Sequence, residues 1–160
     1  MQRKNSILCI VGIISVIIIG TLFITNPFKE EIWNINADNL RNSFNIISGD
    51  ADIEDLSQFT PYEWDVLYSF APYTPKEKIY ETIGYKWDNI TESVSEGMNQ
   101  IVFVKDGKVV CYLYGYPENI KLGFNFGEYK GSYIKLTSEQ NLFFKTTVFD
   151  NGVRYFNYIK

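Results

Sequence analysis

The longest apolar stretch of the chain lies at its beginning. Residues Ile7 to Ile24 carry no charge and follow Arg3 and Lys4. A helix over this run would be roughly 27 Å long, which matches the hydrocarbon thickness of a bilayer. Because positively charged flanks stay inside, the pattern predicts a cytoplasmic stub over 1–5, a transmembrane anchor over 6–25 and an extracytoplasmic domain over 28–160.

A cleaved secretory signal is the alternative interpretation of this run. Signals have shorter apolar regions, typically about 7–15 residues, and end in a small-x-small cleavage site. No such site follows the run, which ends at Thr25-Asn26-Pro27. A lipoprotein signal also fits poorly, because Leu8 precedes Cys9 where a small residue is needed. The residues therefore favour an uncleaved anchor.

Helical periodicity follows the anchor. Over 28–48 the apolar residues recur at spacings of four, three, four and three: Trp33, Ala37, Leu40, Phe44 and Ile47. This spacing predicts one helix whose apolar face packs on the sheet of its own domain, with Gly49 at its end. A second, short helix is expected from Pro75 to about Ile83, because Thr74-Pro75-Lys76-Glu77 has the form of a capping box and Gly84 can end it.

Residues of strand type fill most of the remainder. Two hairpins are predicted, one joining 101–105 to 108–114 through Asp106-Gly107 and one joining 143–149 to 153–159 through a turn over 150–152. Tyr62 to Phe70 and Lys121 to Phe126 read as further strands, and Gly123 suggests a bend or bulge in the latter. The fold class predicted is α+β, with an antiparallel meander of about five or six strands after the transmembrane helix.

Charge and size narrow the classes of function. The chain has 15 Lys and Arg against 19 Asp and Glu, and without Arg3 and Lys4 the exported part keeps 13 against the same 19. This negative balance disfavours binding to nucleic acid or to anionic lipid headgroups. The roughly 135 residues after the anchor suit a single domain with a core of its own.

The chemistry available to the chain is limited because it contains no histidine. This excludes Ser-His-Asp and Cys-His nucleophilic systems and most zinc sites. Cys111 stands among apolar neighbours and is expected to be a buried structural thiol that forms no disulfide with Cys9. The acidic segment after Gly49 fails as a calcium loop, since Asp55 and Pro61 occupy the positions that need Gly and Glu. We expect no metal and no cofactor.

Several short motifs together resemble a family of small exported proteins of Gram-positive bacteria, which are membrane-anchored or of lipoprotein type. The motifs lie between Phe59 and Val110: Trp64-Asp65, Pro72-Tyr73-Thr74-Pro75, Gly84 with Trp87, and the segment from Val102 to Val110. The resemblance implies an exported location but assigns no activity and no functional residue. This chain differs in having a spanning helix in place of a lipidated cysteine.

Two classes of function fit these observations. Tyr112, Tyr114 and Tyr116 share one face of a strand, and if that face points outward they would bind an extracytoplasmic protein or glycan; the alternative is cross-strand pairing that stabilises the sheet. We therefore expect a membrane-anchored, non-catalytic binding protein, either in envelope assembly or of the immunity type. The alternative is a cell-wall glycan hydrolase.

Such a hydrolase would depend on a pair of carboxylates. The candidate pairs are Glu63 with Asp65 on a strand and Glu77 with Glu81 on the short helix. Each pair is more simply explained as a row of solvent-facing charges. For this reason the sequence favours the binding protein over the enzyme.

Overall fold

The structure is a computed structural model in which residues 31–159 are described. The predicted stub and anchor over 1–25 lie outside this range. Within residues 31–159, no helix has both the length and the hydrophobicity needed to cross a bilayer.

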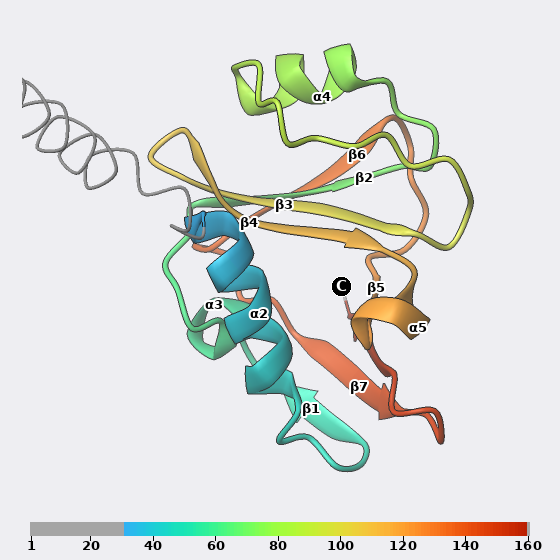
Figure 1. The fold of residues 1–160 in the computed structure, drawn as a ribbon. Coiled ribbons are helices and arrows are strands. Elements are labelled where there is room, and N and C mark those ends of the chain that lie inside the picture. Colours follow the sequence, from blue (N-terminus) through green and yellow to red (C-terminus); the bar gives the residue numbers. More distant parts are fainter. Residues whose placement is uncertain (1–30, 160) are drawn as a thin grey trace, which may run out of the picture. The chain divides into compact units, whose positions relative to one another are not determined.

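The described elements are mostly strands, with helices between some of them (Figure 1). In chain order they are α2 (Ile32–Phe44), β1 (Ala51–Ile53), α3 (Leu56–Phe59), β2 (Val66–Phe70), α4 (Lys76–Ile83), β3 (Asn99–Lys105), β4 (Lys108–Gly115), α5 (Pro117–Ile120), β5 (Leu122–Asn125), β6 (Tyr133–Thr137), β7 (Phe144–Val148) and β8 (Arg154–Tyr158). The predicted α+β class is confirmed by this content.

The strands form two separate sheets of four, in the orders β1-β7-β8-β5 and β4-β3-β2-β6. All pairs are antiparallel except β5 with β8, which is parallel. The predicted single antiparallel meander is therefore wrong. Hairpin signals predict only the pairing of strands that are adjacent in sequence. After β4, however, α5 leads the chain into the other sheet, where β5 pairs with β8 near the end of the chain.

Both predicted hairpins are confirmed. Asp106 and Gly107 have φ of 48° and 70°, the positive values that a tight turn between twisted strands requires. The register of this hairpin shifts between Phe103 and Val104, so Val110 is an extra residue in β4. This bulge turns both Val110 and Cys111 toward the same core.

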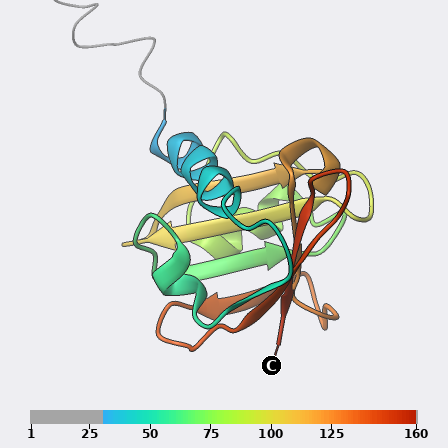
Figure 2. The ribbon, with the colours of Figure 1, turned by 90° about the horizontal axis from the view of Figure 1, so that it is seen from below.

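The larger core contains residues from both sheets and from α2 and α3. Ala37, Leu40 and Phe44 of α2 are buried in it, which confirms that the helical stripe packs within the domain. Figure 2 shows α2 lying along the side of the sheet that contains β4. The Asn36 side chain donates a hydrogen bond to the Val110 carbonyl (2.8 Å), so α2 also supplies a partner for a backbone carbonyl at the bulge of β4. α2 is shorter than predicted, because it ends at Phe44.

A second, smaller core lies on the other face of the β4-β3-β2-β6 sheet. Ile79 and Ile83 of α4 pack there against Phe70, Val102 and Val104. Figure 1 shows α4 above this sheet. The α4 helix thus covers a sheet face that would otherwise be exposed to solvent.

The end of α4 is as predicted, but its beginning is not. Gly84 has φ of 92° and its N–H donates to the Tyr80 carbonyl, which confirms the glycine cap. The Thr74 hydroxyl does not cap the helix: it lies 2.7 Å from the Ala71 carbonyl and 3.1 Å from the Ser132 carbonyl. The cap comes instead from Glu92, which lies further along the chain: its Oε1 accepts the Lys76 N–H (2.9 Å). The predicted capping box is therefore wrong.

Candidate functional site

The predicted tyrosine face is largely internal. Tyr112 is 7% exposed and packs in the smaller core beneath α4 and the segment that follows it. Strand alternation separates Tyr112 and Tyr114 from Cys111 and Leu113, as expected, but both faces of this sheet are covered. The expectation that the tyrosines point outward is therefore wrong for Tyr112. Periodicity shows that a strand has two faces but does not say which one meets solvent.

The hydroxyl groups of this face also have partners inside the protein. The Tyr112 hydroxyl donates to the Thr91 carbonyl (3.2 Å), and burial raises the pKa of Tyr112 to about 12. The Tyr114 hydroxyl donates to the Glu92 carbonyl (3.0 Å). Tyr116 lies beyond the end of β4 and is 40% exposed. Because Tyr112 is buried, the three residues do not form one exposed face, and a role in binding stays a prediction for the half-buried Tyr114 and for Tyr116.

Cys111 is a buried free thiol, as the sequence predicts. Burial raises the pKa of Cys111 to about 12, well above the usual 9.0 of a thiol. Its neighbour is the Tyr62 hydroxyl, whose pKa is also raised by burial. A thiol in this state is protonated at neutral pH and is a poor nucleophile.

The first carboxylate pair, Glu63 and Asp65, lies beside a lysine. Lys105 Nζ lies 2.8 Å from Asp65 Oδ1 and 3.8 Å from Glu63 Oε2. The second oxygen of Asp65 accepts the Asp106 N–H (2.8 Å). The hydrogen bond from Lys105 is the main reason that the pKa of Asp65 is lowered. Asp65 is therefore held as a carboxylate that fastens the β3–β4 turn, and this is the opposite of what a general acid needs.

The second pair lies on the outer side of α4. Glu77 and Glu81 are both exposed, and Glu81 forms an ion pair with Lys78 (3.1 Å). These carboxylates lie one helical turn apart on a solvent-facing surface, where charged pairs of this kind are common and weak.

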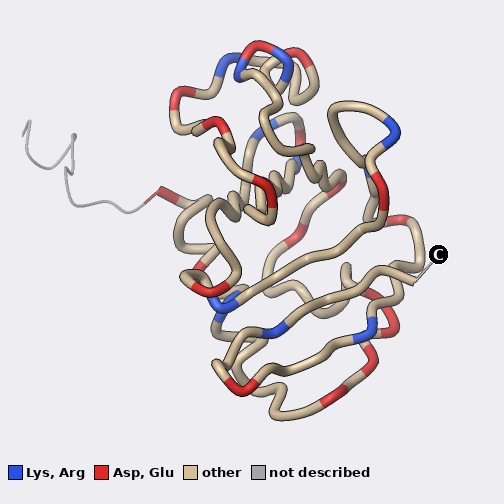
Figure 3. The backbone as a smooth tube through the Cα atoms, turned by 90° about the vertical axis from the view of Figure 1, so that its right-hand side faces the viewer, with Lys and Arg blue, Asp and Glu red and all other residues tan. Residues whose placement is uncertain are grey.

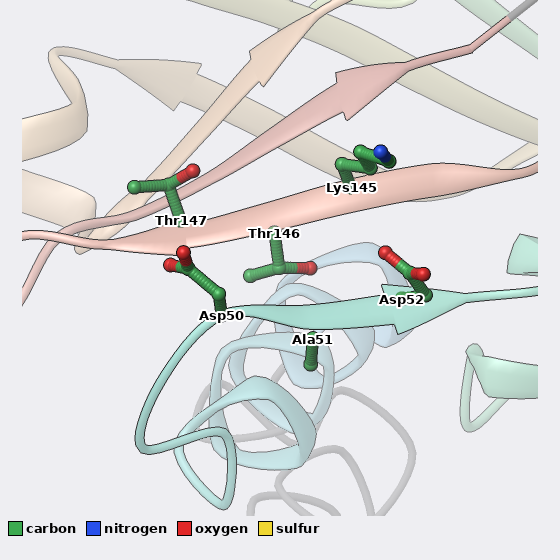
Figure 4. Close-up of a pocket in the computed structure, with 6 residues that line it drawn as sticks. All are labelled: Asp50, Ala51, Asp52, Lys145, Thr146 and Thr147. Carbon is green, nitrogen blue, oxygen red and sulfur yellow. The ribbon is translucent and has the colours of Figure 1, made fainter.

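The acidic segment after Gly49 forms part of an edge strand. Asp50 and Asp52 flank Ala51 beside β7, where a hollow of about 350 Å³ opens against Lys145 and Thr147. In Figure 4 the Thr146 side chain points away from those of Lys145 and Thr147, so its hydroxyl does not join the two carboxylates. Asp52 is paired in register with Lys145 across the strands. This arrangement is typical of a charged strand edge rather than of a cation site.

Two further polar hollows lie around Ser138. These hollows, of about 390 Å³ and about 280 Å³, both include this residue in their walls. We call their union the Ser138 groove. Its walls comprise Glu54, Asp55, Ser57, Gln58, Glu63, Trp64, Asp65, Lys105, Ser138, Glu139, Gln140 and Asn141.

Local hydrogen bonds hold the walls of the Ser138 groove in place. Asp55 begins α3, because its two carboxylate oxygens accept the Ser57 N–H (3.0 Å) and the Ser57 hydroxyl (2.7 Å). The Ser138 N–H donates to the Asp65 carbonyl (3.0 Å), which joins the end of β6 to the start of β2. The Gln140 side chain accepts the Thr137 N–H (2.8 Å) and shapes the turn after β6. The groove is thus built on fixed backbone.

The charge of the Ser138 groove is strongly one-sided. Its walls carry five carboxylates, Glu54, Asp55, Glu63, Asp65 and Glu139, against the single amine of Lys105. Glu54 and Glu139 are exposed. Figure 3 shows acidic and basic positions interspersed on the side of the domain that it presents. Among the hollows described above, the groove is therefore the one that best suits a positively charged, hydrogen-bonding partner.

Sequence reasoning did not find the Ser138 groove. Ser138, Glu139 and Gln140 follow a short edge strand, and their polar character is ordinary for a turn. Their association with Glu63 and Lys105 depends on the pairing of β2 with β6, and no local pattern signals it. Within residues 31–159, no group of three or more His, Cys, Asp or Glu side chains is arranged to hold a metal ion.

Comparison with known proteins adds no relative. No protein family, no curated protein and no solved structure matches this chain.

Proposed function

We propose that the chain is a membrane-anchored extracytoplasmic binding protein without catalytic activity, and that its Ser138 groove receives a basic segment of a partner protein. The observation that carries this proposal is the one-sided charge of a preformed groove, in which exposed Glu54 and Glu139 stand beside carboxylates already fixed by the fold. Complementary charge of this kind promotes specific association.

The state of the reactive groups supports binding over catalysis. Cys111 is buried with a raised pKa, and Asp65 is occupied by Lys105 and the Asp106 N–H. The hydrolase alternative gains no observation in its favour, because the pKa of Asp65 is lowered and because Glu77 and Glu81 lie on an exposed helix face. The proposed setting is envelope assembly or immunity against a toxin, as the predicted anchor suggests.

A glycan is the other class of partner that the sequence allows. Sugar sites combine hydrogen-bonding groups with aromatic side chains against which the rings can pack. The aromatic residue in the wall of the Ser138 groove, Trp64, is buried, and its indole N–H donates to the Thr60 hydroxyl (3.0 Å). This feature favours a basic protein segment.

Site-specific photo-crosslinking in the full-length protein tests the proposal. A photoreactive amino acid replaces the exposed Gln58 in the Ser138 groove, or Glu77 on α4 as a matched exposed control. We expect a discrete protein adduct from position 58 and none from position 77. The double change Glu54→Lys and Glu139→Lys should abolish the adduct, whereas Glu77→Lys with Glu81→Lys should leave it unchanged.

Other results would overturn the assignment. An adduct that survives the groove charge reversal would place the binding surface elsewhere. An adduct that disappears on digestion with a wall hydrolase would show a glycan partner. The anchor is tested separately: protease added to wall-stripped cells should remove the domain and leave a short membrane-bound fragment, and recovery of a soluble chain lacking 1–25 would contradict it.

A further inference from the structure

The end of the domain where the described structure begins carries an aromatic cluster. Trp33 in the first turn of α2 packs edge-on against Trp87 (ring centroids 5.3 Å apart, 87° between planes). Trp87 packs in the same way against Tyr112 (5.3 Å, 83°). The Tyr85 hydroxyl accepts the Val109 N–H (2.9 Å), which ties the segment after α4 to the start of β4. We call this end, formed by Ile32, Trp33, Tyr85, Lys86, Trp87 and Lys108, the Trp33 end.

The Trp33 end has the side chains of a membrane-interface surface. Ile32 is 55% exposed, and Trp33, Tyr85 and Trp87 are partly exposed. Lys86 and Lys108 are exposed beside them. Tryptophan and tyrosine are enriched at the headgroup level of bilayers. The indole N–H of Trp33 is buried without a hydrogen-bond partner within the described residues, so Trp33 contributes apolar contact through the exposed part of its ring. Lysine can lay its apolar stem along the same surface and keep its amine in the headgroups.

The short segment between the predicted anchor and Ile32 places the Trp33 end, rather than another part of the domain, near the bilayer. If the anchor ends at residue 25, seven Cα–Cα steps lead from it to Ile32, and they can span at most about 25 Å. A domain of this size is roughly 36 Å across. The segment between the anchor and Ile32 is therefore shorter than the diameter of the domain. The Trp33 end must stay near the bilayer, and the opposite end of the domain cannot face the membrane.

We propose that the Trp33 end rests in the headgroup region of the bilayer and orients the domain on the membrane. This inference depends on the anchor contained in the proposed function. The surface fits zwitterionic lipid, because the Lys86 amine lies 3.2 Å from the Asp88 carboxylate and the domain as a whole is acidic. Aromatic and aliphatic contact, rather than attraction to anionic headgroups, supplies the affinity.

Tryptophan quenching in the full-length protein tests this orientation. The chain contains three tryptophans, and Trp64 is buried in the larger core. The Trp64→Phe variant therefore reports on Trp33 and Trp87 alone. In phosphatidylcholine vesicles with a quencher attached to the lipid headgroup, we expect this variant to lose about half of its fluorescence, because both rings lie at the headgroup level.

A matched control places the reporter at the opposite end. Phe149 is an exposed aromatic residue next to the turn between β7 and β8. A variant with Phe149→Trp and Trp64→Phe keeps Trp33 and Trp87 in place, and the added tryptophan at position 149 should contribute an unquenched fraction. If substitution of Trp64 impairs folding, the unmodified chain serves instead, with Trp64 supplying an unquenched fraction.

The outcomes separate this inference from the anchor on which it rests. Strong quenching of Trp33 and Trp87 with none at position 149 supports the orientation. Equal or absent quenching at both ends, in a protein that floats with the vesicles, overturns the orientation and leaves the anchor intact. A protein that does not float with the vesicles overturns the anchor and the orientation together.

Discussion

Thr146 has a hydroxyl without a partner inside the protein. The residue is 2% exposed, and its Oγ1 makes no hydrogen bond. An unsatisfied buried hydroxyl costs about 1–3 kcal/mol, and valine has nearly the same shape. Thr146→Val should therefore raise the free energy of unfolding by about 1 kcal/mol, measured from denaturant midpoints.

A neighbouring threonine provides the control for this change. Thr147 is exposed on the other side of the same strand, so Thr147→Val should alter stability by less than about 0.5 kcal/mol. A loss of stability in Thr146→Val would show that the hydroxyl has a hydrogen-bond partner in solution.

The raised pKa of Cys111 predicts an inert thiol. In a Cys9→Ser background, a thiol reagent at pH 8 should label Cys111 only as fast as the domain opens, and denaturant should release full reactivity. Because the folded pKa lies near 12 and the usual value is 9.0, the stability due to this group is complete below pH 9 and declines as the pH rises toward 12. Rapid labelling of the native domain would contradict the burial.

At the scale of elements, Asp65 fastens the β3–β4 hairpin. Its pKa is lowered, so its contribution to stability is present above the usual carboxyl pKa of 3.8 and is lost as the pH falls through the lower folded value. Asp65→Asn should therefore be less stable than wild type at pH 7, and the difference should disappear in acid. Thermal unfolding across this pH range measures it.

Glu63 is the matched control for Asp65. Its side chain is 89% exposed and lies 3.8 Å from the same lysine. Glu63→Gln should change stability little at any pH, since exposed pairs of this kind are weak. Equal effects of the two substitutions would show that the hairpin responds to overall charge rather than to the contacts of Asp65.

Gly123 allows β5 to lie against β8. The two strands pair in parallel with Gly123 opposite Tyr155, and a Cβ at Gly123 would clash with the tyrosine ring. Gly123→Ala should destabilise the domain by about 1–3 kcal/mol through this clash. Adding Tyr155→Ala should recover part of that loss, because the two substitutions are coupled.

A second glycine separates the clash from backbone effects. Nothing lies within 4 Å of a Cβ built on Gly131, and its φ is not in the left-handed region. Gly131→Ala should therefore be neutral or slightly stabilising. If Gly123→Ala were equally harmless, the close packing of Tyr155 would be refuted.

At the scale of the whole molecule, Asn99 links the two sheets. It is a buried residue of β3, yet its amide donates to the Leu122 carbonyl (2.8 Å) and accepts the Phe124 N–H (3.2 Å) on the edge of β5. Asn99→Ala should cost about 2–4 kcal/mol, because it leaves backbone groups unpaired at the junction. Asn125→Ala, at an exposed position of β5, should have a much smaller effect on the denaturant midpoint.

The features that sequence predicted correctly are those decided within a few residues. Asp106-Gly107 specifies a tight hairpin because few residues tolerate positive φ, and Gly84 ends α4 for the same reason. The spacing of Ala37, Leu40 and Phe44 identifies the buried side of α2. These signals depend on steric limits and on helical periodicity, and both act locally.

The features that sequence missed depend on contacts between distant segments. Glu92, rather than Thr74, satisfies the start of α4, because the segment after α4 folds back over it. The Ser138 groove exists because β2 pairs with both β3 and β6, which brings residues near positions 63, 105 and 138 together. No local sequence pattern identifies these contacts.

By itself, the sequence determined the α+β class, the two hairpins, the buried face of α2 and the absence of histidine chemistry. Only the tertiary structure decided that the strands form two sheets, that Tyr112 is internal and that the principal polar groove surrounds Ser138. The physical reason is that backbone conformation and side-chain periodicity are local properties. Which sheet a strand joins, and which face another element covers, is set by the burial of apolar surface over the whole domain.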